Sequence, residues 1–439
     1  MSEAVATQQG LVGKYRPYPE YNDSGVAWLG HIPAQWSLKK LKYLCSIQTG
    51  NKDTVNAEDD GEYPFFVRSQ TVERIGTYTA DCEAVLTAGD GVGVGKVYHY
   101  YNGKFDYHQR VYMLSDFTGV TGRFVYYYLS SNFYKVALEG NAKSTVDSLR
   151  LPQFLNFEFS IPPLDTQDVI VAFLDYETAR IDRLIAQQQR LIELLKEKRQ
   201  AVISHAVTKG LNPNAPMKDS CVEWLGQVPE HWIVTRLKYI GDAKNGLTYS
   251  PDDVVSEGDG ILVLRSSNIQ NAKLSFTDNV YVNMDIPGRI RTKKNDLLIC
   301  SRNGSRKLIG KNALITEEAI GMAFGAFMVL YRSNLNSYLY WVLNSPLFEY
   351  QSGSFLTSTI NQLTIGNLGS MEIPLPPCEE REMIERSLKE KDSYFERLVQ
   401  LSNRKVELLQ ERRTALISAA VTGKIDLRGW TPPAEEVAA

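Results

Sequence analysis

The spacing of hydrophobic residues predicts two long amphipathic helices, at about residues 175–207 and 379–421. In both stretches apolar residues recur every three or four positions among charged ones, and neither stretch contains Gly or Pro. Gly210 and Gly423 stand just beyond the predicted ends, where a helix typically stops. The first stripe consists of Ile181, Leu184, Leu191, Leu195 and Val202, interrupted by Gln188 and Lys198. The second consists of Phe395, Leu398, Leu401, Leu408, Leu409 and Leu416.

A helix of about thirty residues is about 50 Å long and cannot bury a narrow apolar stripe by itself. Two such helices can bury their stripes against each other. We therefore expect an antiparallel two-helix coiled coil between two globular domains. The alternative is that each helix folds back on its own domain, but the narrow stripe and the charged flanks make this arrangement less favourable.

The chain also repeats itself. Trp28–Trp36 returns as Trp224–Trp232, and Leu41–Tyr43 returns as Leu237–Tyr239, at an offset of 196 (224 − 28). A second repeated block has an offset of 214 (415 − 201). It pairs Glu193–Arg199 with Glu407–Arg413, Ala201–Thr208 with Ala415–Thr422, and the Pro162–Pro163 turn with Pro376–Pro377.

The two interiors between these blocks, at about 44–143 and 240–357, align poorly with each other. The plan is a constant frame, a variable insert and a constant closing helix, present twice. Duplication for stability alone would not require a constant frame around a changing insert, whereas a protein that reads two different targets would. A period near 200 residues is also far longer than that of a solenoid repeat, which is about 20–50 residues.

We therefore expect an α+β fold in which two mixed α/β domains are joined by the antiparallel coiled coil, with an internal pseudo-twofold repeat. The expected segments are an N-terminal extension (1–22), a first domain (23–174), a first spacer helix (175–210), a second domain (211–378), a second spacer helix (379–424) and a C-terminal tail (425–439).

Both inserts have the pattern of short strands, turns and some helix. In the first, strands are expected at 63–68, 97–100 and 110–114, a turn-rich loop at 89–95 and a helix at 126–138. In the second, strands are expected at 260–265, 296–301 and 327–331, and a helix at 338–347.

The net charge of −3 and the isoelectric point near 6.1 mean that any nucleic-acid site must come from local charge. Residues 285–311 are rich in Arg and Lys. We expect 301–307 to be a flexible basic loop and 302–311 to contact DNA. Arg and Lys recognise guanine edges and phosphates, Asn and Gln recognise adenine, and Ser binds either. The candidate contacts are Arg68, Ser69, Gln70, Lys96, Lys104, His108, Gln109, Arg110, Lys143, Arg265, Ser266, Ser267, Asn268, Arg302, Asn303, Ser305, Arg306, Lys307 and Lys311.

Enzyme motifs fail on inspection. The glycine-rich run 89–97 has Asp90 where a phosphate-binding loop needs Gly, and Val97 where it needs Ser or Thr. None of the five histidines belongs to a His-Glu-x-x-His motif, and the five cysteines include no Cys-x-x-Cys pair. We expect no catalytic residue and no metal site. The absence of a signal peptide and of a long apolar run favours a soluble, cytoplasmic protein.

The repeated residues resemble a known family. Asp23–Trp36 and Asp219–Trp232 share Asp-Ser-x-Val-x-Trp-Leu-Gly-x-Ile/Val-Pro-x-x-Trp, which resembles the specificity subunit of type I restriction–modification systems. The Pro-Pro turn, the Glu-Leu-Leu-x-Glu-Lys/Arg-Arg helix and its Val-Thr end resemble the family too. So does the segment 353–363, with Thr357–Thr359 and Gln362–Leu363. The resemblance covers about residues 15–428; the first insert departs from it in having the weaker basic loop.

This resemblance implies two target-recognition domains, each reading one half of a bipartite, asymmetric double-stranded DNA site. It also implies that the helices set the spacer between the half-sites and dock two methyltransferase subunits, with restriction subunits joining the complex. S-adenosylmethionine, ATP and Mg would then bind to the partners, and this chain would bind no cofactor itself. Three alternatives stay open: a fused or stand-alone nuclease or methyltransferase, a coiled-coil scaffold, and a stand-alone DNA-binding regulator.

Overall fold

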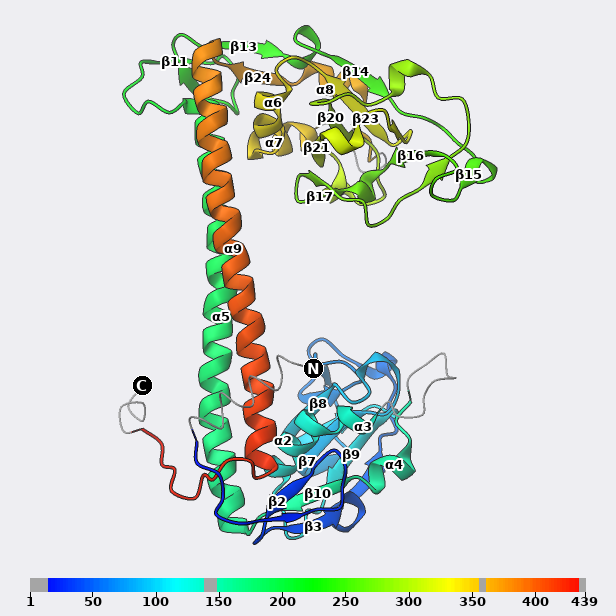
Figure 1. Cartoon of the computed structure of the whole chain (residues 1–439), viewed down its shortest axis with the longest axis vertical. Helices are drawn as coiled ribbons and strands as arrows, with labels where there is room; N and C mark the ends of the chain where they lie inside the picture. Colours follow the sequence, from blue (N-terminus) through cyan, green and yellow to red (C-terminus); the bar gives the residue numbers. More distant parts are fainter. Residues whose placement is uncertain (1–14, 138–147, 355–360, 434–439) are drawn as a thin grey trace. The chain divides into compact units, whose positions relative to one another are not determined.

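The computed structural model describes residues 15–137, 148–354 and 361–433 of the chain (Figure 1). The chain divides into two compact units. Unit 1 comprises Met1–Gln189 and Asn403–Ala439, and unit 2 comprises Arg190–Ser402. Unit 1 is therefore built from both ends of the chain, and the two longest helices each contribute one part to each unit.

These helices are α5 (Leu164–Lys209) and α9 (Cys378–Val421). α5 begins eleven residues before the predicted start at 175. Its first turns bury Ile170, Phe173 and Leu174 in the core of unit 1, so apolar residues cluster there and form no narrow stripe. The amphipathic pattern that marks the rest of the helix is therefore missing from its first turns.

Within each unit the two helices pair antiparallel, as expected. In unit 1 the early α5 residue Asp182 accepts hydrogen bonds from Arg413, near the end of α9. In unit 2 the late α5 residue Arg199 donates to Asp392, near the start of α9. The predicted antiparallel helix pair is confirmed.

The contact seam differs from the predicted stripe by one residue at every second position. Leu191 is exposed while its neighbour Ile192 is buried, and Leu401 and Leu408 of α9 are exposed as well. The predicted stripe and the observed seam of α5 both follow an alternating spacing of three and four residues. The sequence pattern cannot distinguish them, because apolar residues are adjacent at positions such as Leu191 and Ile192. The true seam of α5 contains Ile181, Ile185, Gln188, Ile192, Leu195 and Arg199.

Unit 1 contains a six-stranded sheet with the order β4-β9-β7-β8-β5-β6. β5 and the end of β8 run parallel, and the other neighbours are antiparallel. The strands are β4 (Ser46–Thr49), β5 (Tyr63–Phe66), β6 (Glu73–Ile75), β7 (Ala80–Ala88), β8 (Tyr98–Tyr107) and β9 (Val111–Ser115). Three helices follow: α2 (Gly122–Asn132), α3 (Tyr134–Ala137) and α4 (Leu151–Leu155).

Unit 2 contains a four-stranded sheet with the order β14-β23-β20-β21 and a smaller sheet with the order β15-β19-β16-β22. The strands are β14 (Asp242–Asn245), β15 (Val254–Val255), β16 (Ile261–Leu264), β19 (Tyr281–Val282), β20 (Leu297–Cys300), β21 (Asn312–Leu314), β22 (Ala323–Phe324) and β23 (Met328–Arg332), with β17 (Ile269–Gln270) and β18 (Lys273–Leu274) as a separate hairpin. The helices are α6 (Asn336–Leu343), α7 (Pro346–Ser354) and α8 (Ile365–Ser370).

The two inserts share a plan that their sequences do not reveal. The order β4-β9-β7-β8 in unit 1 matches β14-β23-β20-β21 in unit 2. β16 also runs parallel to β22, as β5 runs parallel to the end of β8. The sheet is therefore repeated together with the frame, and the inserts differ mainly in their loops and added strands.

The predicted strands of both inserts are present, whereas the predicted helices have different limits. The helix expected at 126–138 starts at Gly122 and continues as α3 to Ala137. The helix expected at 338–347 breaks between Leu343 and Pro346. The break has a physical reason, because a proline cannot donate the backbone hydrogen bond of a helix interior but fits the first turn of a new helix.

A frame closes each unit around the end of a long helix. In unit 1 it consists of the pairs β1 (Tyr21–Asp23) with β2 (His31–Pro33) and β3 (Ser37–Lys40) with β10 (Glu158–Ile161). Gly423, just after α9, packs against Pro33 and Trp36 of this frame. In unit 2 the pairs are β11 (Met217–Asp219) with β12 (Gln227–Pro229) and β13 (Ile233–Arg236) with β24 (Glu372–Leu375). Gly210, just after α5, packs against Trp232 in the same way.

No helix within residues 15–137, 148–354 and 361–433 has the length and apolar character that a membrane crossing requires. Within the same ranges, no three His, Cys, Asp or Glu side chains gather as metal ligands would.

Candidate nucleic-acid interface

The loop after β7 and the loop after β20 each end in a glycine followed by a lysine. Gly95 and Gly310 both adopt left-handed backbone, with φ of +69° and +86°, which glycine tolerates best. A Cβ at Gly95 would lie 2.9 Å from the Ala137 Cβ of α3, and one at Gly310 would lie 2.9 Å from Phe348 of α7. We call these two positions the Gly–Lys corners; they place Lys96 and Lys311 in corresponding positions.

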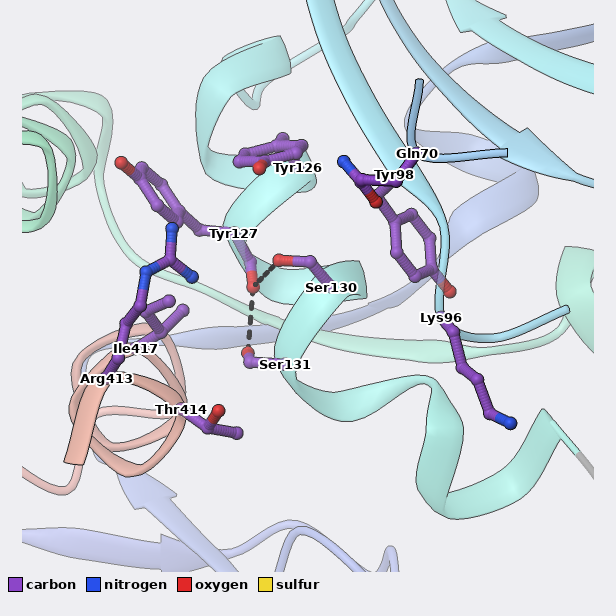
Figure 2. A pocket seen from close by; sticks show the side chains of 10 residues that line it. All are labelled: Gln70, Lys96, Tyr98, Tyr126, Tyr127, Ser130, Ser131, Arg413, Thr414 and Ile417. Atoms are coloured by element: carbon purple, nitrogen blue, oxygen red, sulfur yellow. Dashed lines mark hydrogen bonds between the residues drawn. The ribbon is translucent and has the colours of Figure 1, made fainter. Parts of the chain in front are cut away.

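Lys96 lines a polar cavity of about 270 Å³ in unit 1, shown in Figure 2. The α2 residues Ser130 and Ser131 contribute to its wall, and both hydroxyls donate to the Tyr127 carbonyl. Across the cavity stands α9, which contributes Thr414. The remaining lining residues are Gln70, Tyr98, Tyr126, Tyr127, Arg413 and Ile417.

Lys311 lines a larger cavity, of about 640 Å³, in unit 2. Here Asn344 and Ser345, just after α6, line the wall, and α5 contributes Gln200. The cations Arg306 and Lys307 also lie in the wall, with Glu349 as an acidic neighbour.

The two cavities are built from corresponding positions. At the offset of 214 between the copies, Ser130, Ser131 and Thr414 correspond to Asn344, Ser345 and Gln200 (130 + 214 = 344, 131 + 214 = 345 and 414 − 214 = 200). Each unit therefore combines a lysine from its insert, polar side chains at or just after its short helix, and a polar side chain from the spacer helix that closes it. The polar residues at the short helices and on the spacer helices are not among the predicted DNA contacts, although the repeat could have pointed to them.

Each cavity also has a buried polar atom without a partner in the part of the chain that the structure describes. In unit 1 it is the hydroxyl of Tyr98, whose pKa is raised by burial. In unit 2 it is the Oε1 of Gln200. A buried polar atom without a hydrogen bond is unfavourable, and neither atom is exposed to the cavity that its residue lines.

Other predicted contacts of unit 1 gather around Asp90, whose carboxylate accepts hydrogen bonds from Arg68 and Arg110, both at 2.8 Å. Burial acts to raise the pKa of Asp90, but the two guanidinium groups hold it below its ordinary value. The arginines remain 40 % and 58 % exposed. Asp90 therefore fixes two exposed cations side by side, both with donors free to face a ligand.

His108 is corrected from a DNA contact to a structural residue. Its side chain is buried, and its Nδ1 accepts a hydrogen bond from the Arg110 backbone N–H. Burial lowers its pKa, as do the charges of Arg68 and Arg110, so the neutral ring is favoured. The neighbouring Gln109 is exposed but donates to Asp53 at 2.8 Å.

Asn268 in unit 2 is corrected in the same way. It is fully buried, and its amide group donates to the backbone carbonyls of Ser275 and Asp278 while its Oδ1 accepts from the Arg265 N–H. These bonds hold a turn and leave the amide no access to a base edge. The Ser267 hydroxyl is also buried.

The basic loop 302–311 forms hydrogen bonds with other parts of unit 2. Arg306 donates to the Gly353 carbonyl, Asn303 donates to the Ser266 hydroxyl, and Lys311 donates to the Ser266 carbonyl at 3.1 Å. Burial lowers the pKa of Lys311. Ser305 precedes a short 3-10 helix, η8 (Arg306–Leu308), which also carries Lys307.

The remaining predicted residues are dispersed. The Arg302 guanidinium lies 5.2 Å from the Phe327 ring centroid, and Arg265 pairs with Asp278. Lys104 lies over the Tyr78 ring, outside the cavity lining. The Ser69 hydroxyl donates to the Thr71 carbonyl. Lys143 lies outside the described residues, as do Thr357–Thr359.

Comparison with known proteins places the chain in a family. Residues 33–194 and 229–416 match the type I restriction modification DNA specificity domain. The chain thus contains two copies of a DNA specificity domain, and it belongs to the specificity-subunit family of type I restriction–modification systems.

Relatives match over nearly the whole length. The type I restriction enzyme EcoDI specificity subunit of Escherichia coli is 23% identical, over 90% of this chain and 90% of the relative. The MjaVIII specificity subunit of Methanocaldococcus jannaschii is 22% identical, over 90% and 94%. A chain from a solved structure on complex assembly and conformational transition of the type I R-M system has a TM-score of 0.67 at 15% identity, over 89% of this chain and 98% of that one. That likeness supports the fold.

Proposed function

We propose that this chain is the DNA-reading, non-catalytic specificity subunit of a type I restriction–modification complex, in which each insert reads one half of a bipartite, asymmetric DNA site. The observation that carries the proposal is the repeat of the sheet order and the Gly–Lys corner around unlike loop side chains. Two domains with the same sheet order but different loop side chains suit the recognition of two different half-sites. The cations Arg68, Arg110, Arg306 and Lys307 stand on these loops and suit guanine edges and phosphates.

The spacer helices dock two methyltransferase subunits in this proposal. Leu194 of α5 and Leu408 of α9 occupy corresponding positions (194 + 214 = 408) and are 45 % and 47 % exposed. Each stands beside the same surface ion pair, Arg190 with Glu193 or Arg404 with Glu407. An exposed leucine repeated in both helices suits a partner that binds twice. Restriction subunits join this complex, and S-adenosylmethionine, ATP and Mg bind to the partner subunits.

An exchange of inserts tests the proposal. Residues 44–143 would be replaced by the corresponding insert of a relative, and the methylated sequences would be mapped by methylome sequencing of a host that expresses the complete system. One half of the recognised site should change while the other half and the spacing stay. A change in both halves, or none, would contradict two independent readers.

The alternatives make different predictions. Purified alone, the chain should neither methylate nor cut DNA that carries the mapped site, even with S-adenosylmethionine and Mg added. Activity of the isolated chain would favour a stand-alone enzyme. A gel shift with methyltransferase subunits present should show site-specific binding, and its absence would favour a scaffold.

A further inference from the structure

Most identities between the two frames have a structural reason. Comparison of 23–43 with 219–239 shows buried residues at Pro33, Trp36 and Leu41 and at their counterparts. Gly30 and Gly226 share left-handed backbone, with φ of +67° and +64°. The turn residues repeat their hydrogen bonds: Asp23 and Asp219 accept from the N–H groups of Gly25 and Cys221, and Ser24 and Ser220 accept from those of Val26 and Val222.

One repeated pair is a lysine followed by an exposed tyrosine. The lysines make contacts within their units, since Lys42 donates to the Asn156 Oδ1 at 3.0 Å and Lys238 packs against Gly369, but the tyrosine rings lie outside the cores. Tyr43 is 66 % exposed and its counterpart Tyr239 is 69 % exposed. In each copy the preceding lysine, Lys42 or Lys238, holds its ammonium over the tyrosine ring, 5.2 and 4.9 Å from the centroid. Neither ring packs in a core, so the fold does not require an aromatic residue there.

Both pairs stand away from the DNA-reading loops of their own unit. In unit 1, β4 leads from Tyr43 to Gly50, which abuts the Tyr107 and His108 backbone beside the arginine cluster. In unit 2, β14 leads from Tyr239 to Gly246, which abuts the Phe324 and Gly325 backbone. The nearby Phe327 carbonyl accepts a hydrogen bond from the Arg302 N–H of the basic loop. A four-residue strand spans about 13 Å, so each Lys–Tyr pair lies at the opposite end of a strand from the loops.

We infer that Lys42–Tyr43 and Lys238–Tyr239 are equivalent docking contacts for a partner protein that binds once to each unit. The inference rests on the proposed function, in which two identical methyltransferase subunits bind this chain. A surface that is repeated in both units suits two identical partner subunits. It does not suit the two DNA half-sites, because these differ from each other. The partner surface would offer a carboxylate to the lysine and an apolar or aromatic face to the tyrosine.

The apolar neighbours of the two pairs suit a protein partner, whereas Lys39 and Lys40 beside the pair in unit 1 would also suit a DNA phosphate. Exposed apolar side chains stand in the strands that precede the two pairs, Leu38 in β3 at 39 % and Ile233 in β13 at 58 %. The nearby Arg236 is neutralised by Glu372. Tyrosines and apolar residues dominate the centres of protein interfaces, whereas phosphate contacts need uncompensated cations.

Native mass spectrometry of the co-purified complex tests the inference, with the wild-type chain and its methyltransferase subunit expressed together. Double alanine variants would be made at Lys42 and Tyr43, at Lys238 and Tyr239, and at all four positions. Each single-unit variant should lose one methyltransferase copy or bind it at least about tenfold more weakly, as expected for a hot spot. The four-site variant should weaken both copies.

Tyr350→Ala serves as the control, because Tyr350 is 62 % exposed and its counterpart is Val136 (350 − 214). Tyr43→Phe and Tyr239→Phe keep the aromatic face and should keep both copies, which separates docking from misfolding. Two copies retained at wild-type affinity in the four-site variant would overturn the inference. Retained copies with weaker, less salt-dependent DNA binding would assign the pairs to phosphates and overturn it too. A wild-type chain that recruits no methyltransferase would refute the proposed function itself.

Discussion

Gly95 and Gly310 occupy corresponding positions in two inserts that share little sequence. Each has a left-handed backbone, each abuts a short helix after the sheet, and each is followed by a lysine that lines a cavity. The close packing of each glycine against a helix fixes the position of the loop that contains it.

Replacing Gly310 by Ala should destabilise the chain by about 1–2 kcal/mol, because an L-residue disfavours left-handed backbone and the added Cβ would press on Phe348. The shifted loop should weaken recognition of one half-site. Gly304→Ala, in the same loop, is the matched control, since Gly304 has open space around it and no positive φ. Thermal melting and methylome mapping provide the measurements. Equal melting temperatures for the two variants would count against this account.

Lys96→Ala and Lys311→Ala should each weaken DNA binding of the complex without changing the sequence that it methylates. A lysine that neutralises one phosphate contributes about one unit to the slope of log affinity against log salt concentration, so each variant should lose about that much slope. Lys104→Ala should have a smaller effect, because Lys104 lies over Tyr78 outside the cavity. An altered methylation sequence would instead indicate that the lysine reads a base.

Asp90→Asn should release Arg68 and Arg110 and reduce selectivity for the half-site read by unit 1. The loss of stability should be of order 1 kcal/mol, since both arginines are more than a third exposed and solvent screens the pairs. The folded-state pKa of Asp90 lies below its ordinary 3.8, so its contribution is present at neutral pH and is lost only as the pH falls below that value. Asp81→Asn, at an exposed position of β7, is the control. Unchanged selectivity in the Asp90 variant would exclude a positioning role.

Unit 1 should lose stability as the pH falls below about 6.5, the ordinary pKa of histidine. His99 and His108 are buried, and burial lowers the pKa of both rings, so the unfolded chain binds more protons than the folded one in that range. The neutral His99 ring donates to the Ser69 carbonyl at 3.0 Å, and protonation would charge a buried group. Thermal melting between pH 7.5 and 5.5 should show this loss, and replacing His108 by Gln should reduce it. A flat profile in the wild type would refute the expectation.

Lengthening both spacer helices by one turn should lengthen the gap between the half-sites. Four residues added after Leu191 and after its counterpart Lys405 add about 6 Å, equivalent to one or two base pairs. The methylated half-sites should stay the same while their separation grows. Four residues inserted after Gly258, which has open space around it, should leave the separation unchanged. An unchanged number of base pairs between the half-sites in the lengthened variant would show that the helices do not set the spacing.

The sequence predicts the frames, the long helices and most strands because each leaves a local pattern. It misses the start of α5, where Ile170 and Phe173 are buried on a broad face, and it misplaces the seam, where Leu191 and Ile192 are equally apolar. It also misses the repeated sheet order, which depends on strand pairing between distant residues.

The site is less predictable than the fold. Charge and position suggested Arg68, Arg110, Lys96 and Lys311, but only burial separates them from His108 and Asn268. The spacer-helix residues Thr414 and Gln200 have ordinary polar side chains and lie far along the chain from the insert that they face. Folding alone brings them to the cavities.

The closing contact of Gly423 with Pro33 and Trp36 sets an order of events during synthesis. Unit 2 has all of its segments, Arg190–Ser402, before the last part of the chain is made. The first domain to leave the ribosome is therefore the last to be completed: its core stays open until α9 emerges and supplies Leu416, Ile417 and Val421. A released chain that ends at Ser402 should therefore carry an assembled second domain and an unfinished first one.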